Sequence, residues 1–209
     1  MRLGVLTMIL AGLVLVAACG NPATNKSQAV TGEAQHAASP QAAGAQTYAI
    51  TPENSKIEFV GSKVTGSHNG SFQKFSGQVH YTGDVTTSHV VIPIETESIT
   101  TDDAGLTKHL KTPDFFDTAK YPQAKFESTA IKAGGDKGAS HTITGNLTLH
   151  GVTKSVTFPA TIAVAPDAIT VDSTFTINRK DFGINYAGAA DNLIRDDVVL
   201  TLKVKATKA

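Results

Sequence analysis

The sequence predicts an all-β domain whose strands form an eight-stranded antiparallel β-barrel. Apolar residues alternate with other residues in eight separate runs, which gives each expected strand one apolar face. Turn residues separate most of these runs, and short connections between successive strands favour antiparallel neighbours. Closure into a barrel removes both exposed edges and turns every apolar face inward. We therefore expect a barrel, with an open sandwich as the alternative.

The eight runs place apolar side chains two residues apart, as Ile92 and Ile94 do. This spacing puts those side chains on one face of a strand. Turn-forming residues such as Gly151 and Pro166 lie between runs. The expected strands span residues 56–60, 78–81, 89–95, 124–128, 143–149, 156–162, 169–177 and 198–204.

One long connection, residues 96–123, is expected to carry a short helical insertion at 102–117. An aspartate begins a short helix over 104–111, and a Thr-Pro pair, an N-cap followed by proline, begins a second turn. Phe115 and Phe116 are expected to end that turn with their rings pointing into the domain. Loops of this length in a compact domain are usually functional.

The N-terminal region predicts an exported lipoprotein. Residues 1–18 have one early Arg and then an apolar run, typical of a signal peptide and too short to span a membrane. The residues before Cys19 resemble a lipobox, which predicts cleavage there and lipidation of Cys19. Residues 19–46 lack Phe, Tyr, Leu and Ile, so we expect a lipidated cysteine and a disordered tether, followed by one domain over 47–209.

The signal peptide and the lipidated cysteine together imply a lipid-anchored protein on the periplasmic face of the cell envelope. Two hydrocarbon signals suffice for stable anchoring, so the membrane is an expected partner through Cys19. Gly20 stands where an inner-membrane retention signal would have Asp, so we expect the outer membrane where the organism has one. The sequence leaves a homodimer open.

Composition excludes several function classes. Removing Arg2 from the 18 basic residues leaves 17 against 18 acidic residues, so nucleic acid is not an expected partner. The chain has one Cys and no familiar nucleophile or phosphate-binding motif, and its seven His lack metal-site spacing. We therefore expect no enzyme, no metal and no required cofactor.

The interior of such a barrel is either filled by side chains or holds one ligand. Small residues at inward positions 61, 77, 124, 145, 160 and 173 favour a cavity, because a packed core would need larger side chains. The candidate ligand-lining residues are Ile57, Phe59, Phe75, Val79, Tyr81, Val90, Ile92, Ile94, Phe115, Phe116, Phe126, Leu147, Leu149, Val156, Phe158, Ile162, Phe175, Ile177 and Phe182.

Candidate head-group contacts lie on the two long connections. Lys108, His109 and Lys111 belong to the expected helix beside the barrel mouth, where a cation meets an anionic head group. Arg179 belongs to the second connection, residues 178–196, which is expected to cover one edge or end of the barrel.

Several motifs resemble the YceI-like family of periplasmic lipid-binding proteins, over residues 48–205. The densest motifs are His109–Asp117, Gly145–Thr153 and Asn178–Gly183. The resemblance implies a lipocalin-like barrel whose lumen binds, stores or transports a polyisoprenoid, quinone or fatty-acid derivative without catalysis. Residues 106–108 depart from the Arg-Asp pair that the family often has there. The alternative is an envelope stress or interaction lipoprotein whose packed barrel serves as a scaffold.

Overall fold

The computed structural model describes residues 20–36 and 44–209. Its elements are β1 (Ser27–Gln28), β2 (Val30–Glu33), β3 (Gln46–Ile50), β4 (Lys56–Lys63), β5 (Gly66–Phe72), β6 (Gly77–Tyr81), β7 (His89–Glu95), β8 (Ile99–Thr101), α1 (Ala104–Leu110), β9 (Gln123–Ala133), β10 (His141–Leu149), β11 (Val152–Ala165), β12 (Ala168–Asn178), β13 (Gly188–Ala189), β14 (Asn192–Leu193) and β15 (Asp197–Lys208). Short 3-10 helices are η1 (Val85–Thr87), η2 (Thr96–Ser98), η3 (Asp136–Gly138) and η4 (Arg179–Phe182).

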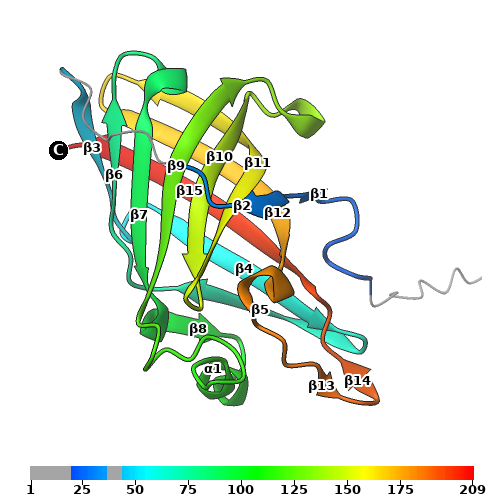
Figure 1. Cartoon of the computed structure of the whole chain (residues 1–209). Coiled ribbons are helices and arrows are strands. Elements are labelled where there is room, and N and C mark those ends of the chain that lie inside the picture. Colours follow the sequence, from blue (N-terminus) through cyan, green and yellow to red (C-terminus); the bar gives the residue numbers. More distant parts are fainter. Residues whose placement is uncertain (1–19, 37–43) are drawn as a thin grey trace, which may run out of the picture.

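Eight antiparallel strands close into a barrel, which confirms the predicted fold class. The alternative, an open sandwich, is wrong. The closed order is β3–β6–β7–β9–β10–β11–β12–β15 and back to β3. β15 also pairs with β4, and the sheet continues from there through β5 and β8. Figure 1 shows α1, the tip of the β4–β5 hairpin and the β13–β14 hairpin gathered at one end, here named the α1 end.

All eight predicted strands are present. The structure adds β3, which alternates through the buried Tyr48 and Ile50 but was not predicted, and further strands that lack the alternating pattern. β5 is the longest of these, and its sequence, Gly66 to Phe72, consists mostly of small and polar residues. It forms because β4 pairs with its whole length. Gly70 has a specific role there, since a Cβ at this position would lie 2.2 Å from Cζ of Phe59.

The helical insertion is confirmed as a single short helix. Asp103 caps α1, because its Oδ1 accepts a hydrogen bond from the Leu106 amide at 2.6 Å. The expected second helical turn is wrong, since the chain after α1 forms hydrogen-bonded turns. The amide of Phe116 donates to the carbonyl of Leu110 at 3.0 Å, and this turn buries Phe115. Among the described residues, no helix has the length and apolar character needed to cross a membrane.

The prediction of a disordered tether is wrong for residues 27–33. β1 pairs with β12 in parallel, and β2 pairs with β11 in antiparallel orientation. A polar segment with few apolar side chains can be ordered here because β11 and β12 offer unpaired backbone groups, which must find partners. Residues 1–18, Cys19 and residues 37–43 lie outside the described part of the chain.

The barrel interior is packed at the end away from α1. Tyr48, Val79, Ile131 and Ile143 are buried there and belong to one continuous apolar core. The small inward residues differ in role: Gly61 and Ala124 line the open part of the interior, whereas Gly77 and Gly145 accommodate neighbouring atoms. A Cβ on Gly77 would lie 3.0 Å from the carbonyl oxygen of Val91.

Gly145 has no room for a side chain. A Cβ there would lie 2.4 Å from Cζ of Phe126 and 2.7 Å from the carbonyl oxygen of Glu127. The backbone atom cannot move aside without disturbing the β9–β10 register, which shifts at this position. Gly145→Ala is therefore expected to lower the free energy of unfolding by about 1–3 kcal/mol, measured by urea unfolding. A matched Gly61→Ala change, with open space around its Cβ, is expected to cost less.

The buried side chain of His89 is expected to make the free energy of unfolding depend on pH. Its side chain is buried on β7, near Glu127, Lys125 and the stacked ring of His80. Burial lowers the pKa of His89 most, and the neighbouring Glu127 partly opposes this change. The folded chain thus keeps His89 neutral, whereas the unfolded chain binds a proton below about pH 6.5. The free energy of unfolding therefore falls as the pH drops below that value.

His89→Gln is expected to flatten this dependence between pH 6.5 and 5. The pKa of Glu127 is also lowered, mainly by a hydrogen bond from Lys125, so its own contribution is lost only below about pH 4.5. Urea unfolding at pH 7.5, 6.5 and 5.5 measures the two slopes. Equal slopes for the variant and the parent would contradict the assignment.

Candidate ligand cavity

A cavity of about 530 Å³ occupies the half of the barrel nearest the α1 end. This volume lies in the range of sites that enclose small molecules. Strands from around the barrel supply the wall, together with α1 and residues 184–195. The apolar lining residues are Ile57, Phe59, Phe72, Ile92, Ile94, Leu106, Leu110, Phe115, Phe116, Ala124, Phe126, Leu147, Leu149, Val156, Phe158, Phe175, Ile177, Ile184, Tyr186, Ala189, Ile194, Val198, Leu200 and Leu202.

Thirteen of the nineteen sequence-predicted lumen residues line this cavity. The other six do not reach it. They are Phe75, Val79, Tyr81, Val90, Ile162 and Phe182. Val79 pairs with Val90 at the packed end, and the ring of Tyr81 meets Tyr48 edge-to-face. Phe182 is fully buried within η4, and Phe75 is buried beside β7. Alternation identifies the inward face of a strand but gives no depth along the barrel.

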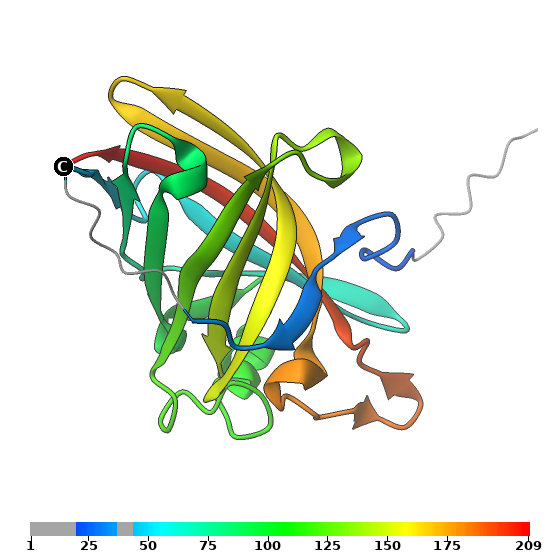
Figure 2. The ribbon, with the colours of Figure 1, turned by 45° about the horizontal axis from the view of Figure 1, so that its top comes forward.

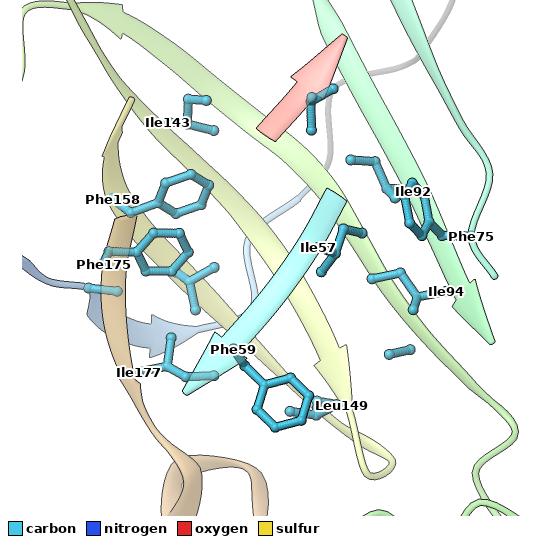
Figure 3. Close-up of a cluster of buried hydrophobic side chains, with 14 of the residues drawn as sticks. Ile57, Phe59, Phe75, Ile92, Ile94, Ile143, Leu149, Phe158, Phe175 and Ile177 are labelled. Atoms are coloured by element: carbon cyan, nitrogen blue, oxygen red, sulfur yellow. The ribbon is translucent and has the colours of Figure 1, made fainter. Parts of the chain in front are cut away.

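Aromatic rings form part of the wall across three strands. The rings of Phe158 on β11 and Phe175 on β12 stack with centroids 4.2 Å apart and an interplanar angle of 8°. Phe126 on β9 lies against Phe158 at 5.8 Å. Figure 3 shows the stacked pair beside Ile177, with Ile57 and Phe59 on the nearby β4 strand. This wall offers only apolar contacts to an occupant.

Polar lining residues are confined to the α1 end. Ser62, Lys63 and His68 come from the β4–β5 hairpin. Asp103 precedes α1, and His109 belongs to it. The remaining three come from the segment after β12; they are Arg179, Asn192 and Arg195. The cavity is therefore amphipathic along its length, with an apolar interior and a polar end.

Of the predicted head-group contacts on the helix, only His109 lines the cavity. Its Nε2 lies 2.7 Å from Oδ2 of Asp114, and its ring packs against Phe115 and Tyr186. Lys108 and Lys111 lie outside the cavity lining, which corrects their predicted position.

Lys111 has a different partner. Its Nζ lies 2.7 Å from Oε1 of Glu97, and Thr118 donates a second hydrogen bond to the same carboxylate. These two hydrogen bonds lower the pKa of Glu97. Lys111 thus fastens the loop after α1 to η2.

Arg179 borders the cavity, but its guanidinium is engaged in holding the wall. Nη1 donates to the carbonyl of Ile184 at 2.7 Å, and Nε donates to that of Arg195 at 3.1 Å. Nη2 reaches Ile194 and Asp196, each at 3.4 Å. Burial lowers the pKa of Arg179, with Asp196 opposing the effect. The geometry gives Arg179 a structural role in place of the predicted head-group contact.

Two polar groups that sequence reasoning missed lie together at the polar end. The amide of Arg195 donates to the carbonyl of Ser62 at 2.8 Å, and both residues line the cavity. Ser62 Oγ and Arg195 Nε are buried and have no hydrogen-bond partner among the described residues. Buried polar atoms normally find partners, so these two are candidates to bind a ligand atom. No periodic pattern marks them in the sequence.

The fold and the cavity define a small, closed β-barrel with an internal apolar cavity and a polar end. The YceI-like domain model matches residues 48–206, which is most of the chain. The chain belongs to the YceI-like family, as its motifs predicted.

Curated relatives come from several Pseudomonas species. A UPF0312 protein of Pseudomonas putida strain W619 is 38% identical over 139 residues, which are 62% of this chain and 70% of the relative. A UPF0312 protein of Pseudomonas fluorescens strain SBW25 is 34% identical over 139 residues, with 63% and 71% covered.

Solved structures share the fold. Burkholderia cenocepacia BcnA has a TM-score of 0.67 and 27% identity, covering 76% of this chain and 99% of BcnA. A polyisoprenoid binding domain from Saccharophagus degradans, implicated in plant cell wall breakdown, has a TM-score of 0.62 and 17% identity, covering 79% and 99%. At this identity, the second similarity establishes the fold alone.

Proposed function

We propose that this protein binds a long-chain amphiphile, with the tail in the barrel cavity and the head group at the α1 end. This proposal rests on the cavity, which has a volume of about 530 Å³, an apolar wall and polar residues at one end only. The ligand class is a polyisoprenoid, a quinone or a fatty-acid derivative. The role is storage or transport at the cell envelope, without catalysis. A scaffold role would need a lumen filled by side chains, which the cavity disfavours.

One solved structure of the same fold agrees with this ligand class. The Saccharophagus degradans domain of the same fold is described as polyisoprenoid binding. A long linear tail suits a cavity with a continuous apolar wall, because each buried methylene contributes about 0.8 kcal/mol.

Organic extraction of purified protein, followed by mass spectrometry, tests the proposal. We expect a co-purifying long-chain amphiphile that an added polyisoprenoid alcohol displaces. Absence of any such lipid, together with no binding of the added alcohol, would overturn it.

Arg195 is proposed to contact the head group. Arg195→Met keeps the apolar stem but removes the donors, so binding of a polyisoprenoid alcohol is expected to weaken roughly tenfold, as for a lost charged hydrogen bond of about 1.5 kcal/mol. Binding of squalene, a hydrocarbon without a head group, should stay unchanged. Lys108→Met, outside the cavity, is the matched control. Equal loss for both ligands would mean that Arg195 only shapes the wall.

The attachment of the protein to a membrane is a separate proposal. We propose that Cys19 carries the lipid anchor and that the domain faces the periplasm. Cys19→Ala is expected to release the protein from the membrane fraction and to leave ligand affinity unchanged. Continued membrane association of that variant would contradict the anchor.

A further inference from the structure

The barrel wall has a seam between β11 and β12. Their backbone ladder runs from Ala165↔Ala168 to Thr161↔Asp172 and stops there. Pro159, two residues beyond, has no amide hydrogen to continue the ladder. Just beyond the ladder one side-chain hydrogen bond still joins the two strands, from Ser173 Oγ to the carbonyl of Pro159 at 2.6 Å. Farther along, their backbones pair with the N-terminal segment and not with each other. β2 pairs with β11 at residues 154–157, and β1 pairs with β12 at Phe175 and Thr176.

The N-terminal segment, residues 27–33, therefore completes the wall from outside. Figures 1 and 2 show it in blue, lying against β11 and β12. It buries little apolar surface, because Ala29 is its one core residue and Val30 is 70% exposed. The amide of Ala29 donates to the carbonyl of Thr176 at 2.8 Å, so the segment is joined to both sides of the seam.

Side-chain contacts of the segment are polar and lie near the surface. Thr31 Oγ1 donates to Oδ2 of Asp181 at 2.7 Å, and Glu33 pairs with Lys154 at 2.9 Å. Ser27 Oγ also donates to Oδ2 of Asp136 at 2.7 Å. The hydrogen bonds of Ser27 and Thr31 are partly buried, whereas the exposed Glu33–Lys154 ion pair contributes little to stability. Releasing the segment would leave every other strand pairing of the barrel intact, so the segment is suited to local opening.

The seam borders the cavity wall. Val156 and Phe158 on β11, and Phe175 and Ile177 on β12, flank the seam and also line the cavity. The stacked rings of Phe158 and Phe175 bridge the two strands. A linear apolar chain that passed between β11 and β12 would contact apolar side chains throughout.

We propose that residues 27–33 are a detachable strand and that the seam beneath them is a side passage through which the tail enters and leaves the cavity. This inference rests on the proposed lipid-binding function. With the passage closed, the α1 end would still hold the head group, so the segment controls exchange rates and not capacity.

The segment lies close to the proposed anchor in sequence. Ser27 lies eight positions after Cys19, so the fully extended link between them reaches at most about 28 Å. A lipid on Cys19 would therefore hold the seam beside the membrane surface, with a shorter link than a disordered tether of residues 19–46 allows. Lipid tails from that membrane are then the nearest molecules to the passage.

A disulfide lock tests the passage. Val30 and Thr157 are register partners on the outer face of β2 and β11. Val30→Cys and Thr157→Cys are combined with Cys19→Ser in the chain from residue 19, loaded with a fluorescent polyisoprenoid alcohol. Transfer to phosphatidylcholine vesicles is followed over time. We expect the oxidised lock to slow transfer at least tenfold, reduction to restore it, and deletion of residues 20–36 to accelerate it.

The matched control is a disulfide away from the seam. Thr148 and Thr153 are register partners on the β10–β11 hairpin, and Thr148→Cys with Thr153→Cys should leave the transfer rate unchanged. Equal transfer from the oxidised and reduced lock, with full loading of both, overturns the side passage while the lipid-binding function stands. Failure of both forms and of the parent to load the alcohol overturns that function instead.

Discussion

Ala124→Phe is expected to weaken binding of a polyisoprenoid alcohol roughly fiftyfold. Ala124 on β9 is buried and lines the cavity. A phenyl ring there displaces about three carbons of a bound tail, at about 0.8 kcal/mol each. The loss of about 2.4 kcal/mol corresponds to that factor in Kd. Equilibrium titration with a fluorescent alcohol measures it.

The control for this variant lies on the same strand. Ala133 is exposed at the end of β9 and lies outside the cavity, so Ala133→Phe should bind the alcohol as the parent does. Urea unfolding of both variants shows whether the fold is retained. Unchanged affinity in folded Ala124→Phe would place the ligand outside this cavity.

The strands that sequence could predict are those whose pattern is local. Alternation in residues 89–95 or 169–177 is visible because each strand buries one of its own faces. β5 has no such pattern and depends on pairing with β4. β1 and β2 depend on edges that β11 and β12 leave unpaired, more than a hundred residues away. No property of residues 27–33 alone reveals those edges.

The cavity was predictable in kind and only partly in its residues. Val198, Leu200 and Leu202 belong to a run recognised as a strand, so their inward face was available from the sequence. Ile184 and Ile194 come from irregular backbone without a period. Glycine at inward positions was an uneven sign of space: Gly61 lines the cavity, but the ring of Phe126 fills the volume that a side chain at Gly145 would occupy.

Charged residues show the same limit more sharply. A basic residue beside an expected barrel mouth looks like a head-group contact, yet Lys111 is directed to Glu97. The buried pair of Ser62 and Arg195 is created by a contact between β4 and the segment before β15. Such tertiary pairing decides which polar atoms stay free for a ligand.

Arg179→Met is expected to lower the free energy of unfolding by about 3–5 kcal/mol, because it removes a buried cation that several acceptors surround. The carbonyls of Ile184 and Arg195 would lose their donor, and each buried unpaired acceptor adds to the cost. Residues 184–195 form the cavity wall at the α1 end, so their loosening should also weaken ligand binding. Urea unfolding without ligand separates this structural effect from any head-group contact.

Lys180 provides the matched control for this change, since it shares Asp196 with Arg179. Its Nζ lies 3.0 Å from Oδ2 of Asp196, but the Lys180 side chain is 48% exposed and that of Arg179 is 5% exposed. Lys180→Met removes an exposed ion pair and is expected to cost less than about 1 kcal/mol. Similar losses from the two variants would show that the charge of Asp196, and not the buried hydrogen bonds of Arg179, holds the wall. A stable Arg179→Met protein with weakened binding of the alcohol but not of squalene would return Arg179 to the head-group site.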